Sequence, residues 1–351
     1  MALKITQKGE KIRNFIISLF DDKNELTCSE ISAKVMKKFE ITQNTVRKHL
    51  QNMSDQGALN KKPKENSNRL LYSLPSPEFH SFEYDAKSQD LNEASVWIKD
   101  IEPLLSIQGV GCKDILNVSF CEIFNNAIEH ANAKKIQVNL LIDALHTMIV
   151  VYDDGIGIFK KIKEDLNLAD EHLSLIELSK GKFTSDPKNH SGEGVYFASR
   201  ACDYFLIASN NLLYTRATHK PLGLLQDLDV SQQGTTVIMR VKNNTSNSSR
   251  KVYDKFSSVE EGFFKTKVPV RLLRYKDEGI VSRSQARRLL ARFDMFRVVE
   301  LDFEGIDMIG QAFTDEIFRV FKTNHPEVEI QVVNACKNVK DMISRTNNTV
   351  R

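Results

Sequence analysis

Hydrophobic and polar positions divide the first 75 residues into three predicted helices and a hairpin. Between residues 8 and 20 the apolar side chains recur every three or four positions, which predicts a helix with one buried face. Thr27 and Glu30 have the spacing of a capping box, in which each side chain accepts a hydrogen bond from the backbone N–H of the other, so a second helix is predicted to begin there. A third helix is predicted over residues 43–50, and a basic hairpin over residues 61–72.

The third helix leaves a polar and basic surface near its N-terminus, because Val46 and Leu50 point inward. Side chains of this kind suit base edges and phosphates in a DNA groove. The hairpin adds three basic side chains, the hairpin lysines. The candidate DNA-binding residues are Gln43, Asn44, Thr45, Arg47 and Lys48 of the helix and the hairpin lysines Lys61, Lys62 and Lys64.

Charge is distributed unevenly along the chain. Residues 1–75 contain 14 Lys and Arg against 8 Asp and Glu, a balance of +6, whereas the remaining residues contain 35 against 38, a balance of −3. A basic segment on a slightly acidic body favours a polyanionic partner at that end. The element order resembles the winged helix-turn-helix of bacterial transcription regulators, and this resemblance implies binding of double-stranded DNA. A dimerisation or protein-docking role is the alternative.

Three short motifs in the middle of the chain combine into a predicted nucleotide site. A predicted helix places Glu122 and Asn126 four positions apart on one face. An apolar strand over residues 148–152 runs into Asp153 and an Asp-x-Gly-x-Gly turn, where glycine lets the backbone approach a ligand. Residues 191–195 open the next helical pattern with two glycines, and the N–H groups at a helix N-terminus bind phosphate.

These motifs, with a later Gly-Thr strand, resemble the GHKL superfamily of ATP-binding domains over residues 85–245: gyrase, MutL-type repair proteins, ninety-kilodalton heat-shock chaperones and histidine kinases. The resemblance implies that ATP and Mg²⁺ bind, with Asn126 holding Mg²⁺ and Glu122 as general base. The run Glu-x-x-x-Asn-Ala-x-x-His-Ala from Glu122 to Ala131 is most similar to the anti-sigma-factor serine kinases.

The same resemblance assigns the remaining nucleotide contacts. Asp153 corresponds to the residue that accepts a hydrogen bond from the adenine amino group. Lys182 precedes the phosphate glycines and is a candidate phosphate contact, with a solvated loop lysine as the alternative. The resemblance implies that the cofactor contacts Asn126, Asp153, Gly155, Gly157, Gly192, Gly194 and Thr235, and Lys182 joins these candidates because its loop could bring it to a phosphate.

Strands and helices alternate in the last third of the chain at lengths typical of a small α/β domain. Strands are predicted over residues 268–273, 298–303 and 329–333. The run Leu301–Phe313 resembles the STAS-like domains related to anti-sigma-factor antagonists, and this resemblance implies a regulatory protein partner.

The antagonists present a phosphorylated Ser in the loop before a helix, but residues 309–312 of this chain hold no hydroxyl. Thr314 lies further on, inside the predicted helix. Ser282 and Ser284 remain candidate acceptors, with a helix cap as the alternative.

Composition narrows the setting. Hydrophobic residues make up 41% of the chain and charged residues 27%, as in ordinary globular proteins. The five cysteines form no Cys-x-x-Cys pair, so neither a disulfide framework nor a zinc site is predicted. No apolar run approaches membrane-spanning length and the N-terminus has no secretory pattern, so a cytoplasmic protein without a membrane partner is expected.

Together the patterns predict a multidomain α+β protein. It comprises a winged helix-turn-helix at residues 1–75, a GHKL-type α/β sandwich at residues 76–250 and a small α/β STAS-like domain at residues 265–351. The predicted function is a regulator that binds ATP and Mg²⁺ and couples nucleotide state to DNA or partner binding. The alternative is a Ser/Thr kinase of the anti-sigma-factor type, or a stand-alone ATPase, with Glu122 as base. A second copy of the chain is a further candidate partner, in a homodimer.

Overall fold

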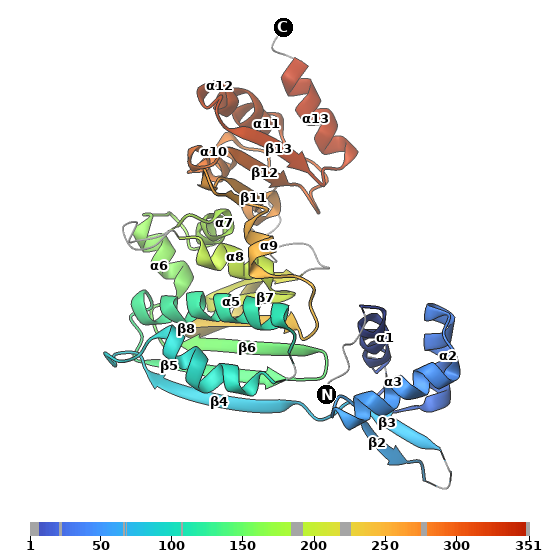
Figure 1. Cartoon of the computed structure of the whole chain (residues 1–351). Coiled ribbons are helices and arrows are strands. Elements are labelled where there is room, and N and C mark those ends of the chain that lie inside the picture. The colour runs from blue at the N-terminus through green and yellow to red at the C-terminus, as the bar shows by residue number, and fades with distance from the viewer. Residues whose placement is uncertain are drawn as a thin grey trace.

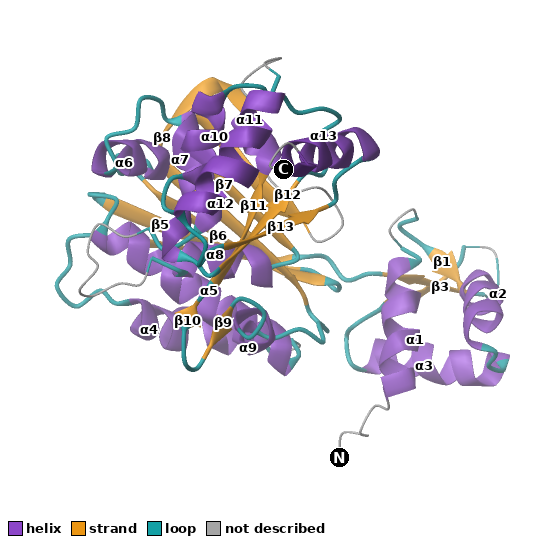
Figure 2. Cartoon of the chain, turned by 90° about the horizontal axis from the view of Figure 1, so that it is seen from above, coloured by secondary structure: helices purple, strands orange, loops and turns teal. Residues whose placement is uncertain are grey.

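The described part of the chain is a mixture of helices and strands that form several separate sheets (Figure 1). The computed structural model describes residues 7–20, 23–65, 67, 69–106, 108–183, 192–217, 226–274 and 279–348. Figure 2 shows the N-terminal helices set to one side of the remaining elements, joined to them by the strand that follows.

The N-terminal region packs helices against a small antiparallel sheet. Its elements are α1 (Gln7–Ser18), β1 (Leu26–Thr27), α2 (Cys28–Phe39), α3 (Gln43–Asp55), β2 (Asn60–Pro63) and β3 (Leu70–Ser73). The strands lie in the order β1-β3-β2. The capping box of Thr27 and Glu30 is confirmed, since both reciprocal hydrogen bonds are present. Val46 and Leu50 of α3 are buried, as predicted.

The central region is an antiparallel sheet covered by helices on one face (Figure 1). Its strands are β4 (Glu78–Asp85), β5 (Lys135–Ile142), β6 (His146–Asp153), β7 (Tyr204–Ala217) and β8 (Gln226–Lys242), in the order β4-β5-β6-β8-β7. Its main helices are α5 (Val110–Glu129), α6 (Ile158–Asp165), α7 (His172–Lys180) and α8 (Gly194–Ala201). Burial alternates along β5 and β6, because one face of a half-covered sheet packs against the helices.

The C-terminal region is built on a parallel sheet. Its strands are β11 (Lys265–Pro269), β12 (Val298–Asp302) and β13 (Glu329–Val333), in that order. Its helical segments are η3 (Val270–Leu273), α10 (Arg283–Leu290), η4 (Phe293–Met295), α11 (Gln311–Asp315), η5 (Glu316–Phe321), α12 (Lys322–Asn324) and α13 (Lys337–Asn348). The predicted strand over residues 268–273 is wrong in its second half, which forms the 3₁₀ helix η3. Pro269 has no N–H for the ladder and ends the strand there.

The candidate phosphoacceptors of this region have structural partners. Ser282 caps α10 in a capping box with Gln285, the alternative that the sequence left open. Thr314 is fully buried in α11, and its hydroxyl donates a hydrogen bond to Gly310 O at 2.9 Å. A kinase therefore cannot reach Thr314 in the folded chain without opening α11.

The central and C-terminal regions share one hydrophobic core, whereas the N-terminal region has its own. The polar run at residues 242–249, for which the sequence predicts a linker or hairpin tip, packs against α5, where Ser249 N donates to Asp114 Oδ2 at 2.8 Å, and against the start of β6. Asn243 is 3% exposed, and its side chain accepts from the Thr147 hydroxyl and donates to Asp143 O, both at 2.7 Å. It leads to α9 (Ser249–Tyr253), which contacts α5 and α8. The two regions are thus joined by packed structure.

Candidate functional site

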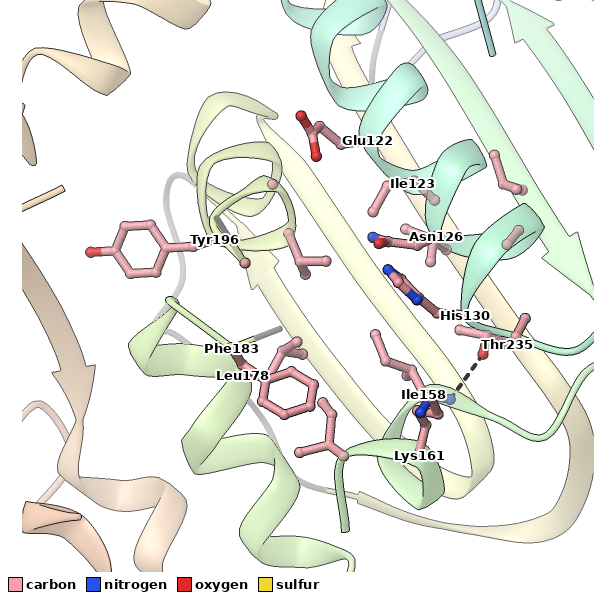
Figure 3. Close-up of a pocket in the computed structure, with 18 of the residues that line it drawn as sticks. Glu122, Ile123, Asn126, His130, Ile158, Lys161, Leu178, Phe183, Tyr196 and Thr235 are labelled. Carbon is pink, nitrogen blue, oxygen red and sulfur yellow. Dashed lines mark hydrogen bonds between the residues drawn. The ribbon is translucent and has the colours of Figure 1, made fainter. Parts of the chain in front are cut away.

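One cavity of ≈ 270 Å³ collects most of the predicted nucleotide residues (Figure 3). It lies among α5, the end of β6, the middle of β8, the start of α6, the chain after α7 and the start of α8. Seven of the nine predicted residues line it: Glu122, Asn126, Asp153, Gly157, Gly192, Gly194 and Thr235. Gly155 and Lys182 are not part of the lining.

One edge of α5 supplies the polar row of the cavity. Glu122, Asn126 and His130 are spaced by four residues, so they follow one another along the helix, and Figure 3 shows all three facing the cavity. The opposite side of α5 is buried through Phe120 and Phe124, which fixes the rotation of the helix. The core packing therefore determines which side chains reach the site.

The carboxylate of Glu122 lies at the N-terminus of α8. A Cβ atom built on Gly194 would lie 2.0 Å from Glu122 Oε2, so only glycine allows this approach. The helix dipole favours negative charge at this end of α8. The same position suits an anionic phosphate beside a carboxylate base, provided that a cation offsets their repulsion.

Asp153 ends β6 at the floor of the cavity and is 5% exposed. Its Oδ1 accepts a hydrogen bond from Gly155 N at 3.0 Å. Burial raises the pKa of the Asp153 carboxyl to about 6, although hydrogen bonds from Gly155 and Thr235 act in the opposite direction. A buried acceptor that points into a cavity is suited to an N–H donor of a ligand.

The glycines after Asp153 shape the floor. A Cβ atom on Gly155 would lie 2.2 Å from Ala131 O, so this glycine lets the turn pack under the end of α5. Gly157 has φ +91°, which favours glycine, and precedes α6. Thr235 pairs with Asp153 across β8 and β6, and its hydroxyl accepts from Ile158 N at 3.1 Å, the dashed line in Figure 3.

Lys182 lies apart from the other predicted contacts. Its ammonium donates a hydrogen bond to Met295 O at 2.7 Å and lies 4.7 Å from the Phe296 ring centre, so it faces the C-terminal region. Gly192 and Gly194 are at the cavity, while Ser191 of the same motif is outside the described residues.

Several lining residues were not predicted from the sequence as nucleotide contacts. His130 lies in the run from Glu122 to Ala131 without an assigned role, and the apolar lining residues Ile158, Leu178 and Phe183 belong to no motif. Lys161 also lines the cavity, and its ammonium contacts Asp165 at 2.8 Å. Ile158 and Lys161 could have been found from the sequence, because their spacing places them on one face of the helix that begins after the glycine turn. Nothing local marks Phe183.

A metal at this site would need ligands from outside the protein. Within the described residues, no group of three or more His, Cys, Asp or Glu side chains could hold a metal ion. The cavity lining includes the Asn126 amide and the Glu122 carboxylate, oxygen donors one helical turn apart on α5, while the other lining carboxylates, Asp153 and Glu193, come from separate elements. Such a sparse donor set fits Mg²⁺, which usually takes one or two protein ligands together with water and substrate phosphates.

The candidate DNA-binding residues cluster on the N-terminal region. Gln43, Asn44, Arg47 and Lys48 are exposed on α3, and Thr45 is half-buried. The hairpin lysines are exposed as well. Two of them already have partners: Lys61 donates to Gln51 Oε1 at 3.2 Å and Lys62 contacts Glu25 at 2.5 Å.

Comparison with known proteins identifies one part of the chain. A family model described as a STAS-like domain of unknown function matches residues 285–340, which confirms the predicted STAS-like region there. Among curated proteins nothing matches the chain. No helix within the described residues is long and apolar enough to span a membrane.

Proposed function

We propose that the chain is an ATP- and Mg²⁺-dependent regulator in which a GHKL-type central domain couples nucleotide state to a winged helix and to the STAS-like domain. The observation that carries the proposal is the cavity itself. Seven residues between positions 122 and 235, predicted from their motifs, line one cavity that offers a buried acceptor, a helix N-terminus and oxygen donors. In that space Asp153 accepts from the adenine amino group, and the N-terminus of α8 receives the phosphates.

Mg²⁺ would be held by Asn126 and by the phosphate oxygens, and it would offset their negative charge beside Glu122. Glu122 is placed to take a proton from an attacking hydroxyl, because it lies at the phosphate end of the cavity beside Gly194. If the hydroxyl belongs to water, the reaction is ATP hydrolysis. If it belongs to a Ser or Thr side chain, the reaction is protein phosphorylation.

The proposed output is DNA binding by the N-terminal region. The exposed polar and basic residues of α3 and the hairpin lysines support it, together with the balance of +6 over residues 1–75. For nucleotide to control this output, ATP must bind two states of the protein with different affinity, since equal affinity shifts no equilibrium.

The test follows γ-labelled ATP with Mg²⁺ in wild type and Glu122→Ala. If wild type releases free phosphate and the variant does not, the protein is an ATPase. Label on the protein that disappears in the variant identifies a kinase, and the labelled residue can then be mapped. Binding without either product leaves a nucleotide sensor. Failure of the wild-type protein to bind ATP refutes the proposal.

A further inference from the structure

Residues 181–183 form one side of the cavity, called the wall below. This wall is attached to the C-terminal region. Gly181 and Phe183 line the cavity directly after α7. The guanidinium of Arg292, which follows α10, donates to Lys182 O and, at 3.4 Å, to Gly181 O. In return, Lys182 Nζ donates to Met295 O at 2.7 Å. Two consecutive backbone carbonyls of the wall and one side chain are therefore held by a different region of the chain.

The attachment is anchored by a buried carboxylate. Glu177 of α7 is 4% exposed and contacts two cations, Lys180 Nζ at 2.6 Å and Arg292 Nη1 at 2.9 Å. Lys180 is fully buried and also donates to Ala291 O at 2.8 Å and to Arg288 O at 3.3 Å, so it caps the C-terminus of α10. A carboxylate shared by a cation from each region fixes their relative position more tightly than an apolar contact would.

The backbone is held in uncommon conformations at both ends of this contact. Gly181 has φ +77°, Lys182 has φ +54° and Arg292 has φ +63°. Left-handed conformations of non-glycine residues cost free energy and persist only where surrounding contacts determine them. Their pairing here indicates that the contact determines the path of the wall.

The wall in turn touches the phosphate end of the cavity. A Cβ atom on Gly192 would lie 2.2 Å from Phe183 O, so the backbone of Phe183 packs directly on Gly192, two residues before α8 begins. A shift of the wall would therefore move the glycine that precedes the helix N-terminus.

We infer that Arg292 is a positioning residue for the nucleotide site, through which the STAS-like region sets nucleotide affinity. The inference rests on the proposed nucleotide function and adds the route of its regulation. A protein partner that displaces α10 or η4 changes how well the cavity holds nucleotide. By thermodynamic reciprocity, nucleotide changes the affinity for that partner by the same factor.

The test compares two Arg→Gln substitutions in the full chain. Arg292→Gln removes the guanidinium that holds Gly181, Lys182 and Glu177. Arg288→Gln is the matched control, because the Arg288 side chain is exposed and only its carbonyl contacts Lys180. Affinity for a fluorescent ATP analogue with Mg²⁺ is measured well below the unfolding temperature. We expect binding at least about fivefold weaker for Arg292→Gln, the lower end of typical allosteric couplings, and unchanged binding for Arg288→Gln.

Two further measurements separate positioning from folding. Arg292→Lys keeps a cation for Glu177 but lacks the second nitrogen that reaches the wall, so it should be more stable than Arg292→Gln and still bind the analogue more weakly than wild type. In the wild type, nucleotide should slow hydrogen exchange over residues 292–296. Unchanged affinity in both Arg292 variants, or unchanged exchange, overturns the inference while the proposed function stands. Failure of wild type to bind the analogue overturns the proposed function itself.

Discussion

The Asp153→Asn substitution should abolish ATP binding and at the same time stabilise the free protein. Burial raises the pKa of Asp153 from 3.8 to about 6, so the folded chain holds an ionised carboxylate at a cost at neutral pH. A shift of about two units corresponds to about 3 kcal/mol. The amide replaces one acceptor oxygen with a donor, so one hydrogen bond within the turn is lost. This loss lowers the free energy of unfolding by about 1 kcal/mol. The expected net gain is about 2 kcal/mol.

The contribution of Asp153 to the free energy of unfolding depends on pH. Because the folded pKa of Asp153 is raised, the folded state takes up a proton as pH falls through about 6, while the unfolded state does so only near 3.8. The penalty is therefore complete above pH 6 and disappears below pH 3.8. The effect of Asp153→Asn should follow the same profile: a net gain of about 2 kcal/mol at pH 7, and a loss of about 1 kcal/mol at low pH, where only the missing hydrogen bond remains.

Urea denaturation and calorimetric titration with ATP and Mg²⁺ measure both effects. Asp154→Asn is the matched control: Asp154 accepts from the Lys134 and Lys135 N–H groups, at 2.7 and 2.9 Å, and these contacts lower its pKa. Its substitution should destabilise the fold and leave ATP affinity unchanged. If Asp153→Asn destabilises the protein, or still binds ATP as wild type does, Asp153 is not the buried adenine acceptor.

Four other predictions concern Asp153, the ion pairs of Glu177 and the hairpin lysines. Binding of adenosine, which has no titrating phosphate, should weaken about tenfold at pH 5 relative to pH 7, because about a tenth of Asp153 is then ionised; a flat profile measured by competition contradicts this. Glu177→Gln should lower the free energy of unfolding by about 4 kcal/mol in urea denaturation, since it leaves the buried Lys180 and the half-buried Arg292 without their carboxylate. Lys180→Met should cost only about 2 kcal/mol, because Glu177 keeps Arg292, and an equal or larger loss refutes this account. Neutralising the three hairpin lysines should reduce the steepness of the fall of log K with log salt concentration for duplex binding, by about 1 to 3. An unchanged slope excludes the hairpin from the DNA interface.

Local patterns predicted the parts of the site that neighbouring residues determine. The spacing of Glu122 and Asn126 fixes their common face on any helix, and the buried side of α5 then turns that face to the cavity. Asp153 was predictable because an apolar strand leads directly into a glycine turn. The strand expected at residues 268–273 failed for a related reason: an apolar run is buried in either conformation, so periodicity alone does not distinguish a short strand from a 3₁₀ turn.

Lys182 shows which contacts local sequence patterns do not predict. Beside a phosphate motif, a loop lysine is a reasonable phosphate contact, yet its ammonium bonds to a carbonyl 113 positions further along the chain. That contact forms where Glu177 and Lys180 of α7 meet Arg292, which follows α10. The two segments are far apart in the sequence, and neither has enough polar residues to mark a site by itself. The charge expected to hold a phosphate instead ties residues 181–183, beside the cavity, to the C-terminal region. Regulation by the STAS-like region would then need no residue of that region inside the nucleotide site, since a displacement at Arg292 is enough to move Gly181 and its neighbours.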